Sequence, residues 1–169
     1  MPDTFIKIAS VTVGAGGASS IDFTSIPSTY TDLCVKLSAR GTNAAVVISP
    51  ILYLNNDTSA GSFKSLVGNG SAASSSGTSG YIDAGVISSA NATSSTFGNF
   101  EIYIPNYAGS TYKSVSSDSV TENNATEAYA NFRALLWANT AAINAVKFTL
   151  GAGNFAQYST ATLYGIKNS

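Results

Sequence analysis

The sequence contains no histidine and only one cysteine among its 169 residues. Without histidine there is no Ser-His-Asp arrangement, and the commonest general base and most transition-metal sites are excluded. One thiol cannot build a thiolate zinc site. Cys34 alternates with Leu33, Val35 and Leu37 in "TDLCVKLSAR", so we expect an inert thiol that is buried or at a packing contact. We therefore predict that the protein is not an enzyme and holds no metal or cofactor.

Charge is also scarce, because Asp, Glu, Lys and Arg together make up 10% of the sequence, against about a quarter in ordinary domains. The formal net charge is −1 and the eight Lys and Arg residues are scattered singly. This pattern lacks the basic footprint of a nucleic-acid-binding protein. Solubility must come from Ser, Thr, Asn and Gly, and such a surface suits a particle component or an extracellular adhesin better than a cytosolic enzyme.

Long hydrophobic runs are missing as well. The longest, residues 44–54, is interrupted by Ser49 and Pro50, and nothing approaches the length of a membrane span. The N-terminal segment "MPDTFIKIAS" is too short and too polar for a signal peptide. We expect a protein that is made in a cytoplasm, stays soluble and does not associate with a membrane.

What the sequence does contain is apolar residues at every second position, separated by Gly, Ser and Asn turns, which is typical of β-strands. We expect about eight to ten short strands, including segments at 31–39, 45–55 and 97–107. The length suits a single domain with one core. The sequence thus predicts an all-β fold, a single antiparallel β-sandwich of jelly-roll type spanning residues 1–169.

Three segments carry more specific expectations. Residues 68–80, "GNGSAASSSGTSG", are of low complexity and are predicted to form a flexible Gly/Ser-rich surface loop. Residues 127–137 fit a helix or a strand locally, and the all-β surroundings favour a strand. Residues 142–150 and 155–166 are predicted to form a final hairpin across "GAGN", with a bulge at Gly165.

Three polar stretches resemble known sites superficially. Asp118, Glu122 and Glu127 are the closest group of carboxylates, and a glycosidase needs two such groups across a cleft; solvated charges are the favoured interpretation. "GAGGAS" at 14–19 lacks the glycine that opens the helix of a dinucleotide-binding loop, so it is predicted to be a turn. "NND" at 55–57 offers oxygen ligands for calcium but lacks the spaced carboxylates of a dedicated loop, and a turn is again favoured.

Aromatic residues are the one surplus. Tyr103, Tyr107, Tyr112, Tyr158 and Trp137 could form a platform that stacks on sugar rings, although packing in the core or at a subunit interface accounts for them better. The candidate glycan or partner contacts are Tyr107, Tyr112 and Tyr103.

Three stretches together carry a resemblance to a known group: "STYTDLCVKLSAR", "FGNFEIYIPNYAGSTYKSVSSDSV" and "LWANTAAINAVKFTL…FAQYSTATLYGIKNS". They resemble small virion structural proteins of tailed bacteriophages, especially cyanophage-like capsid decoration (cement) proteins and tail-fibre-type modules. The resemblance covers most of the chain outside residues 55–96 and consists of strands and turns, so it transfers no functional residue. Residues 55–96 are where partner or host specificity would vary.

The resemblance implies a decoration protein on the capsid surface of a virion, made in the host cytoplasm, that binds the major capsid protein and stabilises the head. The alternative is a tail or fibre-tip module that recognises a host surface glycan. No nucleic acid or membrane partner is expected. A homotrimer is expected, since decoration sites on an icosahedral shell have three-fold or quasi-three-fold symmetry.

Overall fold

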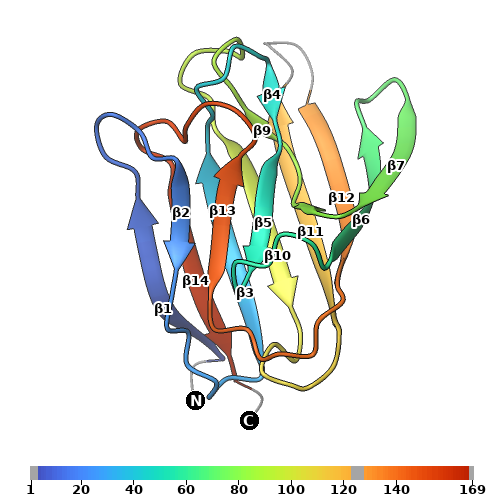
Figure 1. The fold of residues 1–169 in the computed structure, drawn as a ribbon. Helices are drawn as coiled ribbons and strands as arrows, with labels where there is room; N and C mark the ends of the chain where they lie inside the picture. Colours follow the sequence, from blue (N-terminus) through green and yellow to red (C-terminus); the bar gives the residue numbers. More distant parts are fainter. Residues whose placement is uncertain (1–3, 123–127, 168–169) are drawn as a thin grey trace.

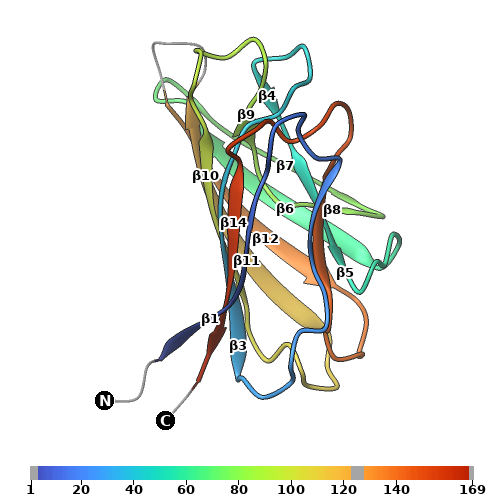
Figure 2. The same ribbon diagram turned by 90° about the vertical axis from the view of Figure 1, so that its left-hand side faces the viewer.

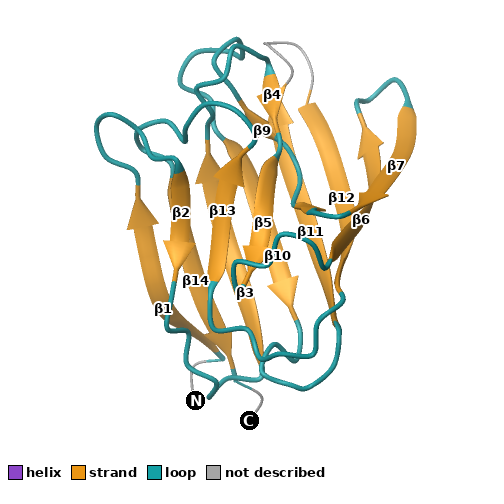
Figure 3. Ribbon diagram, in the orientation of Figure 1, coloured by secondary structure: helices purple, strands orange, loops and turns teal. Residues whose placement is uncertain are grey.

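The computed structural model describes residues 4–122 and 128–167, and within them the chain forms strands and no helix. Antiparallel sheets pack against each other, which Figure 1 and the view turned by 90° in Figure 2 show from two sides. Strands and their connecting loops account for the whole described ribbon in Figure 3. The predicted all-β sandwich is confirmed.

One sheet has eight strands and forms the broad layer of the sandwich. Its long strands alternate buried and exposed residues, as the period-two pattern of the sequence predicts. In spatial order its strands are β1 (Phe5–Thr12), β14 (Thr160–Ile166), β3 (Asp32–Ala39), β10 (Gly98–Ile104), β11 (Lys113–Glu122), β12 (Ala128–Trp137), β6 (Gly61–Gly68) and β7 (Ala73–Ser79).

The second layer is smaller. A four-stranded sheet contains, in spatial order, β2 (Ser20–Phe23), β13 (Val146–Leu150), β5 (Pro50–Leu54) and β8 (Ile82–Asp83). A two-stranded sheet pairs β4 (Val47–Ile48) with β9 (Ile87–Ser88). The single strand expected over 45–55 is therefore divided at Ser49, because β4 and β5 belong to different sheets.

Successive strands alternate between the two layers at both ends of the chain. β1 and β3 lie in the large sheet while β2 and β5 lie in the small one, and β13 and β14 insert between these earlier strands. Figure 1 shows β2, β13 and β5 in front of β1, β14, β3 and β10. The strands β11, β12, β6 and β7 continue the large sheet beyond this part.

An apolar core fills the space between the facing sheets. The alternation predicted for 97–107 is confirmed, since Phe100, Ile102 and Ile104 are all buried. They pack with buried side chains of both sheets, among them Leu33, Val35, Leu37, Leu52, Leu54, Val146, Phe148 and Leu163.

The inner face of β11, β12 and β6 carries buried polar groups. Arg133 Nη1 on β12 lies 2.6 Å from Asp83 Oδ2 on β8, and its guanidinium stacks 5.0 Å from the ring of Phe63. Hydroxyls of β11 bond to the segment that follows β8: Ser117 Oγ donates to the carbonyl of Ala84 (2.5 Å). Hydrogen bonds and an ion pair, together with a few apolar contacts, therefore hold this part of the large sheet to the second layer.

The flexible loop predicted over 68–80 is wrong for Ala73–Ser79, which form β7 and pair with β6 along their whole length. The side chain of Asn69 closes the turn by accepting bonds from the amides of Ser71 (3.1 Å) and Ala72 (2.8 Å). Pairing of this kind uses the backbone, so it does not require side chains that pack in a core.

The predicted C-terminal hairpin is also wrong, because residues 151–154 cross between layers: β13 pairs with β2 and β5, and β14 pairs with β1 and β3. The strand predicted over 127–137 is confirmed for Ala128–Trp137. The bulge predicted at Gly165 is wrong, because β14 pairs regularly with β3 through Gly165. The pairing of β1 with β14 is irregular instead within β1, between Lys7 and Ala9.

Gly165 lets the Tyr30 ring lie against β14, since a methyl group there would overlap the ring. We expect Gly165→Ala to lower the free energy of unfolding by about 1–3 kcal/mol, measured by urea titration. Gly151→Ala is the control, because a methyl group at Gly151 has no atom within 4 Å, and it should change stability by less than about 0.5 kcal/mol. Equal effects of the two changes would contradict this packing.

The ion pair of Arg133 and Asp83 has side chains that are 6% and 12% exposed. Arg133→Met alone should lower the free energy of unfolding by about 3–5 kcal/mol, because it leaves a buried carboxylate without its partner. The double variant Arg133→Met/Asp83→Asn should be less destabilised than Arg133→Met. Lys36→Met, at the exposed ion pair of Lys36 and Glu101, should lower the free energy of unfolding by at most about 1 kcal/mol. A similar loss for Lys36→Met and Arg133→Met would contradict the conclusion that the pair of Arg133 and Asp83 is buried.

Candidate functional site: the outer face of the large sheet

The outer face of the large sheet, turned away from the second layer, has residues in rows because neighbouring strands are in register. One row crosses it through directly paired residues: Lys36, Glu101, Asp118, Phe132, Leu66 and Ser75. The row is charged on β3, β10 and β11 and becomes apolar on β12 and β6. The outer face therefore has a charged half and an apolar half.

The apolar half centres on Phe132, which is 53% exposed, and on its cross-strand neighbour Leu66, which is 63% exposed. Val120 and Leu136 add further exposed apolar surface. Small residues surround the large ones, and we call the whole set the Phe132 patch: Phe132, Leu66, Val120, Leu136, Ala130, Ala134 and Gly68. Contiguous exposed apolar surface of this kind is characteristic of an interaction site.

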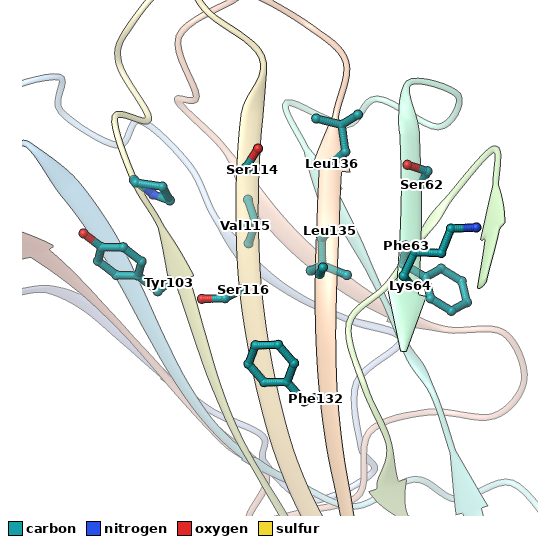
Figure 4. Close-up of a pocket in the computed structure, with 12 residues that line it drawn as sticks. Ser62, Phe63, Lys64, Tyr103, Ser114, Val115, Ser116, Phe132, Leu135 and Leu136 are labelled. Carbon is teal, nitrogen blue, oxygen red and sulfur yellow. The ribbon is translucent and has the colours of Figure 1, made fainter. Parts of the chain in front are cut away.

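Because Ala130 and Ala134 flank Phe132 along β12, the ring stands above its surroundings and the face is hollowed on both sides. One hollow, about 470 Å³ in volume, extends from Phe132 to Tyr103 and Leu136, as Figure 4 shows. The other, about 440 Å³, lies between Phe132, Leu66 and Val120. A partner surface with protruding side chains could fill both.

Tyr103 forms the far wall of the first hollow, and its ring is fixed. Its hydroxyl donates to Asp32 Oδ2 (2.7 Å), while Asp32 Oδ1 accepts the amide of Asn106 (2.8 Å). The bond to the Asp32 carboxylate raises the pKa of Tyr103. The bond to Asp32 therefore holds the Tyr103 ring in place at the wall of the hollow.

The charged half of the face carries one positive and two negative side chains in its central row. Lys36 and Glu101 form an exposed ion pair, and Asp118 lies opposite Glu101 on the next strand. Cys34 lies in the neighbouring row, opposite Tyr103 on one side and Tyr164 on the other. It is buried, as predicted, and burial raises the pKa of its thiol.

The predicted contact residues separate into two groups. Tyr107 is fully buried and its hydroxyl donates to the carbonyl of Pro27, while Trp137 is buried with its indole N–H 2.9 Å from Asp57 Oδ2. For both, core packing is confirmed, and neither ring is available to a ligand. Tyr103 and Tyr112 are exposed. Tyr158 is exposed too, but it precedes β14 at the end of the sheet opposite Tyr112, so the five aromatic residues form no common platform.

The centre of the site lies on a residue that the sequence pattern does not single out. The polarity of β12 favours Arg133 and Asn131 at the surface and Phe132 in the core. The structure has the opposite orientation, with Arg133 and Asn131 buried and Phe132 exposed. The useful signal was the pair Leu135–Leu136, because adjacent apolar residues on a strand must lie on opposite faces.

The other polar candidates are engaged in structural bonds. Glu122 accepts bonds from Thr93 and Thr96, and Glu127 lies outside the described residues. Asn55 Oδ1 accepts the amide of Asn144 (2.8 Å), as expected of a turn. No group of three or more His, Cys, Asp or Glu in the described segments could hold a metal ion.

Residues 14–19 contain the predicted turn, in which the amide of Gly17 donates to the carbonyl of Gly14 (3.2 Å). Residues 4–122 and 128–167 include no helix long and apolar enough to cross a bilayer. No family model matches the chain, and no curated protein matches it. The site must therefore be interpreted from its own geometry.

Asp57 makes a pH-dependent contribution to the stability of the fold. It lies near the end of β12, where it accepts a hydrogen bond from Trp137. The amide of Ser59, first of all, and the indole of Trp137 lower the pKa of Asp57 from 3.8 to about 2. A carboxyl with a depressed pKa stabilises the fold above its unfolded pKa and loses that effect as pH falls through the folded value. Asp57→Asn should therefore lower stability at pH 7 by roughly 1 kcal/mol. The difference should vanish as pH falls from about 4 to 2 in thermal melts; a difference independent of pH would contradict this role.

Proposed function

We propose that this protein is a virion structural protein, a decoration protein that binds the major capsid protein lattice of a phage head through the Phe132 patch. The observation that carries the proposal is the exposed apolar surface around Phe132 and Leu66, on a protein with few charges. Its resemblance to small phage virion proteins points the same way.

We infer further that the sandwich is a jelly roll with an extension. The order β1-β14-β3-β10 opposite β2-β13-β5-β8, with successive strands alternating between sheets, supports this topology. The strands β11, β12, β6 and β7 are then additions to one sheet. The Phe132 patch lies on these additions, which supports a role for them beyond completing the core.

The character of the face favours a protein partner. Protein interfaces have an apolar centre, few charges there and a polar rim, and the Phe132 patch is bordered by Lys64 on β6 and Asp118 on β11. The face over β10 to β7 covers roughly 500–600 Å², below the ~800 Å² per partner of a standard interface. A single contact would be weak, and repeated contacts on a lattice, or through the expected trimer, would make the attachment tight.

Phe132→Ser should weaken binding to purified heads that lack this protein by at least tenfold, as expected for a central aromatic contact. The free energy of unfolding should fall by no more than about 1.5 kcal/mol, because about half of the Phe132 side chain is already exposed. Tyr158→Ser is the matched control, since Tyr158 is 69% exposed and lies away from the patch. Co-sedimentation with heads measures both variants, and undiminished binding by the Phe132 variant would contradict the proposal.

A second function, recognition of a host glycan by a tail or fibre-tip module, has one observation in its favour. The fixed Tyr103 ring and the hydroxyls of Ser114 and Ser116 line the same hollow as Phe132, and rings with nearby hydroxyls suit sugars. Glycan-array binding that is lost in Tyr103→Ala, together with no binding to heads, would favour this function. A blank array with tight binding to heads would favour decoration.

A further inference from the structure

The last strand of the large sheet, β7, has a free edge. It pairs with β6 and with no other strand of the described chain. All seven of its residues are exposed. An edge of this kind presents a row of unpaired backbone donors and acceptors, to which another strand can be added.

The hydrogen bonds of the hairpin show which groups are free. The amide of Gly80 donates to the carbonyl of Gly61 (2.8 Å), and at the other end the amide of Asn69 donates to the carbonyl of Ala72 (3.2 Å). Since bonded and non-bonded pairs alternate in an antiparallel ladder, this register directs to β6 the backbone groups of Ser74, Ser76 and Thr78. The backbone groups that point away from β6 are those of Ala73, Ser75, Gly77 and Ser79.

The two edges of the large sheet differ in protection. At the opposite edge, β1 carries the exposed Lys7 and an irregular register between Lys7 and Ala9, and lysines and bulges are the devices that prevent edge-to-edge pairing. β7, "ASSSGTS", has neither a charge nor a proline, and its register with β6 is continuous. Of the two edge strands, only β1 carries these features that oppose pairing with another strand.

We propose that β7 pairs with β7 of a second copy of this chain, antiparallel about a two-fold axis. With Ser75 of one copy opposite Gly77 of the other, all the outward backbone groups are paired. The same register places Ser76 opposite Ser76 and Ser74 opposite Thr78, which are favourable hydroxyl pairs. No charged side chain of β7 opposes its symmetry mate, so the strand is complementary to itself.

This pairing makes one continuous sheet from two copies. Directly paired residues point to the same face, so the two Phe132 patches lie on the same side of the joined sheet. The pairing does not depend on the proposed capsid role. It produces a dimer, whereas the trimer expected from shell symmetry would need a different contact, and the mass in solution distinguishes the two.

The test is light scattering during gel filtration over a range of concentrations. The protein should move from 17.3 kDa toward twice that mass as concentration rises. Ser75→Pro removes an outward amide without touching the β6 ladder, and proline is tolerated on edge strands. Because two bonds are lost per dimer, self-association should weaken by roughly thirtyfold or more. Ser75→Ala, which keeps the amide, should behave like the unchanged protein.

Ser75→Lys is the second variant in case the proline disturbs the hairpin, because it keeps the amide and adds a charge at the edge; it should also remain monomeric. Amide exchange gives an independent measurement. At high concentration the amides of Ser75, Gly77 and Ser79 should become protected, while those of Ser74, Ser76 and Thr78 are protected at every concentration. A monomer at all concentrations, a mass of three chains, or a dimer unaffected by both variants would overturn the proposal.

Discussion

The ion pair between Arg133 and Asp83 makes the inward orientation of Arg133 on β12 possible, and the exposed surface depends on that orientation. Arg133 and Asn131 lie under the sheet, where Asp83, on β8 of the second layer, neutralises the guanidinium. Burying a charge without a partner would be strongly unfavourable, so the pair couples β12 to β8. Since side chains alternate along a strand, the inward position of Arg133 requires that Phe132 point to solvent. The polar side chains under β12 and the apolar side chains on its outer face both follow from this one orientation of the strand.

This orientation of β12 creates the exposed apolar surface. An exposed phenylalanine beside an exposed leucine on neighbouring strands does not add to the core, and a domain of this size already has a large one. The strands that carry these residues extend one sheet beyond the part covered by β2, β13 and β5. The core of facing sheets supplies stability, and the extension carries the surface on which the proposed contact with another protein rests.

Most strands could be predicted from the sequence, because regular alternation such as that in Gly98–Ile104 is characteristic of a strand with one buried face. Connectivity could not, since the short segment 151–154 fits a hairpin as well as a crossing between layers. The strand Ala73–Ser79 could not be predicted, because backbone pairing does not require any pattern among small polar side chains. The site could not be predicted for a different reason. Polarity assigns Arg133 to solvent and Phe132 to the core, and the partner that neutralises Arg133 lies on β8, 50 positions away in the sequence.

The most direct test of the central claim is cryo-electron microscopy of the virion that carries this protein. The account predicts density for the chain on the head, with the outer face of the large sheet against the major capsid protein and Phe132 buried in that contact. Density found only at the tail, or a head-bound molecule whose Phe132 patch faces solvent, would contradict it.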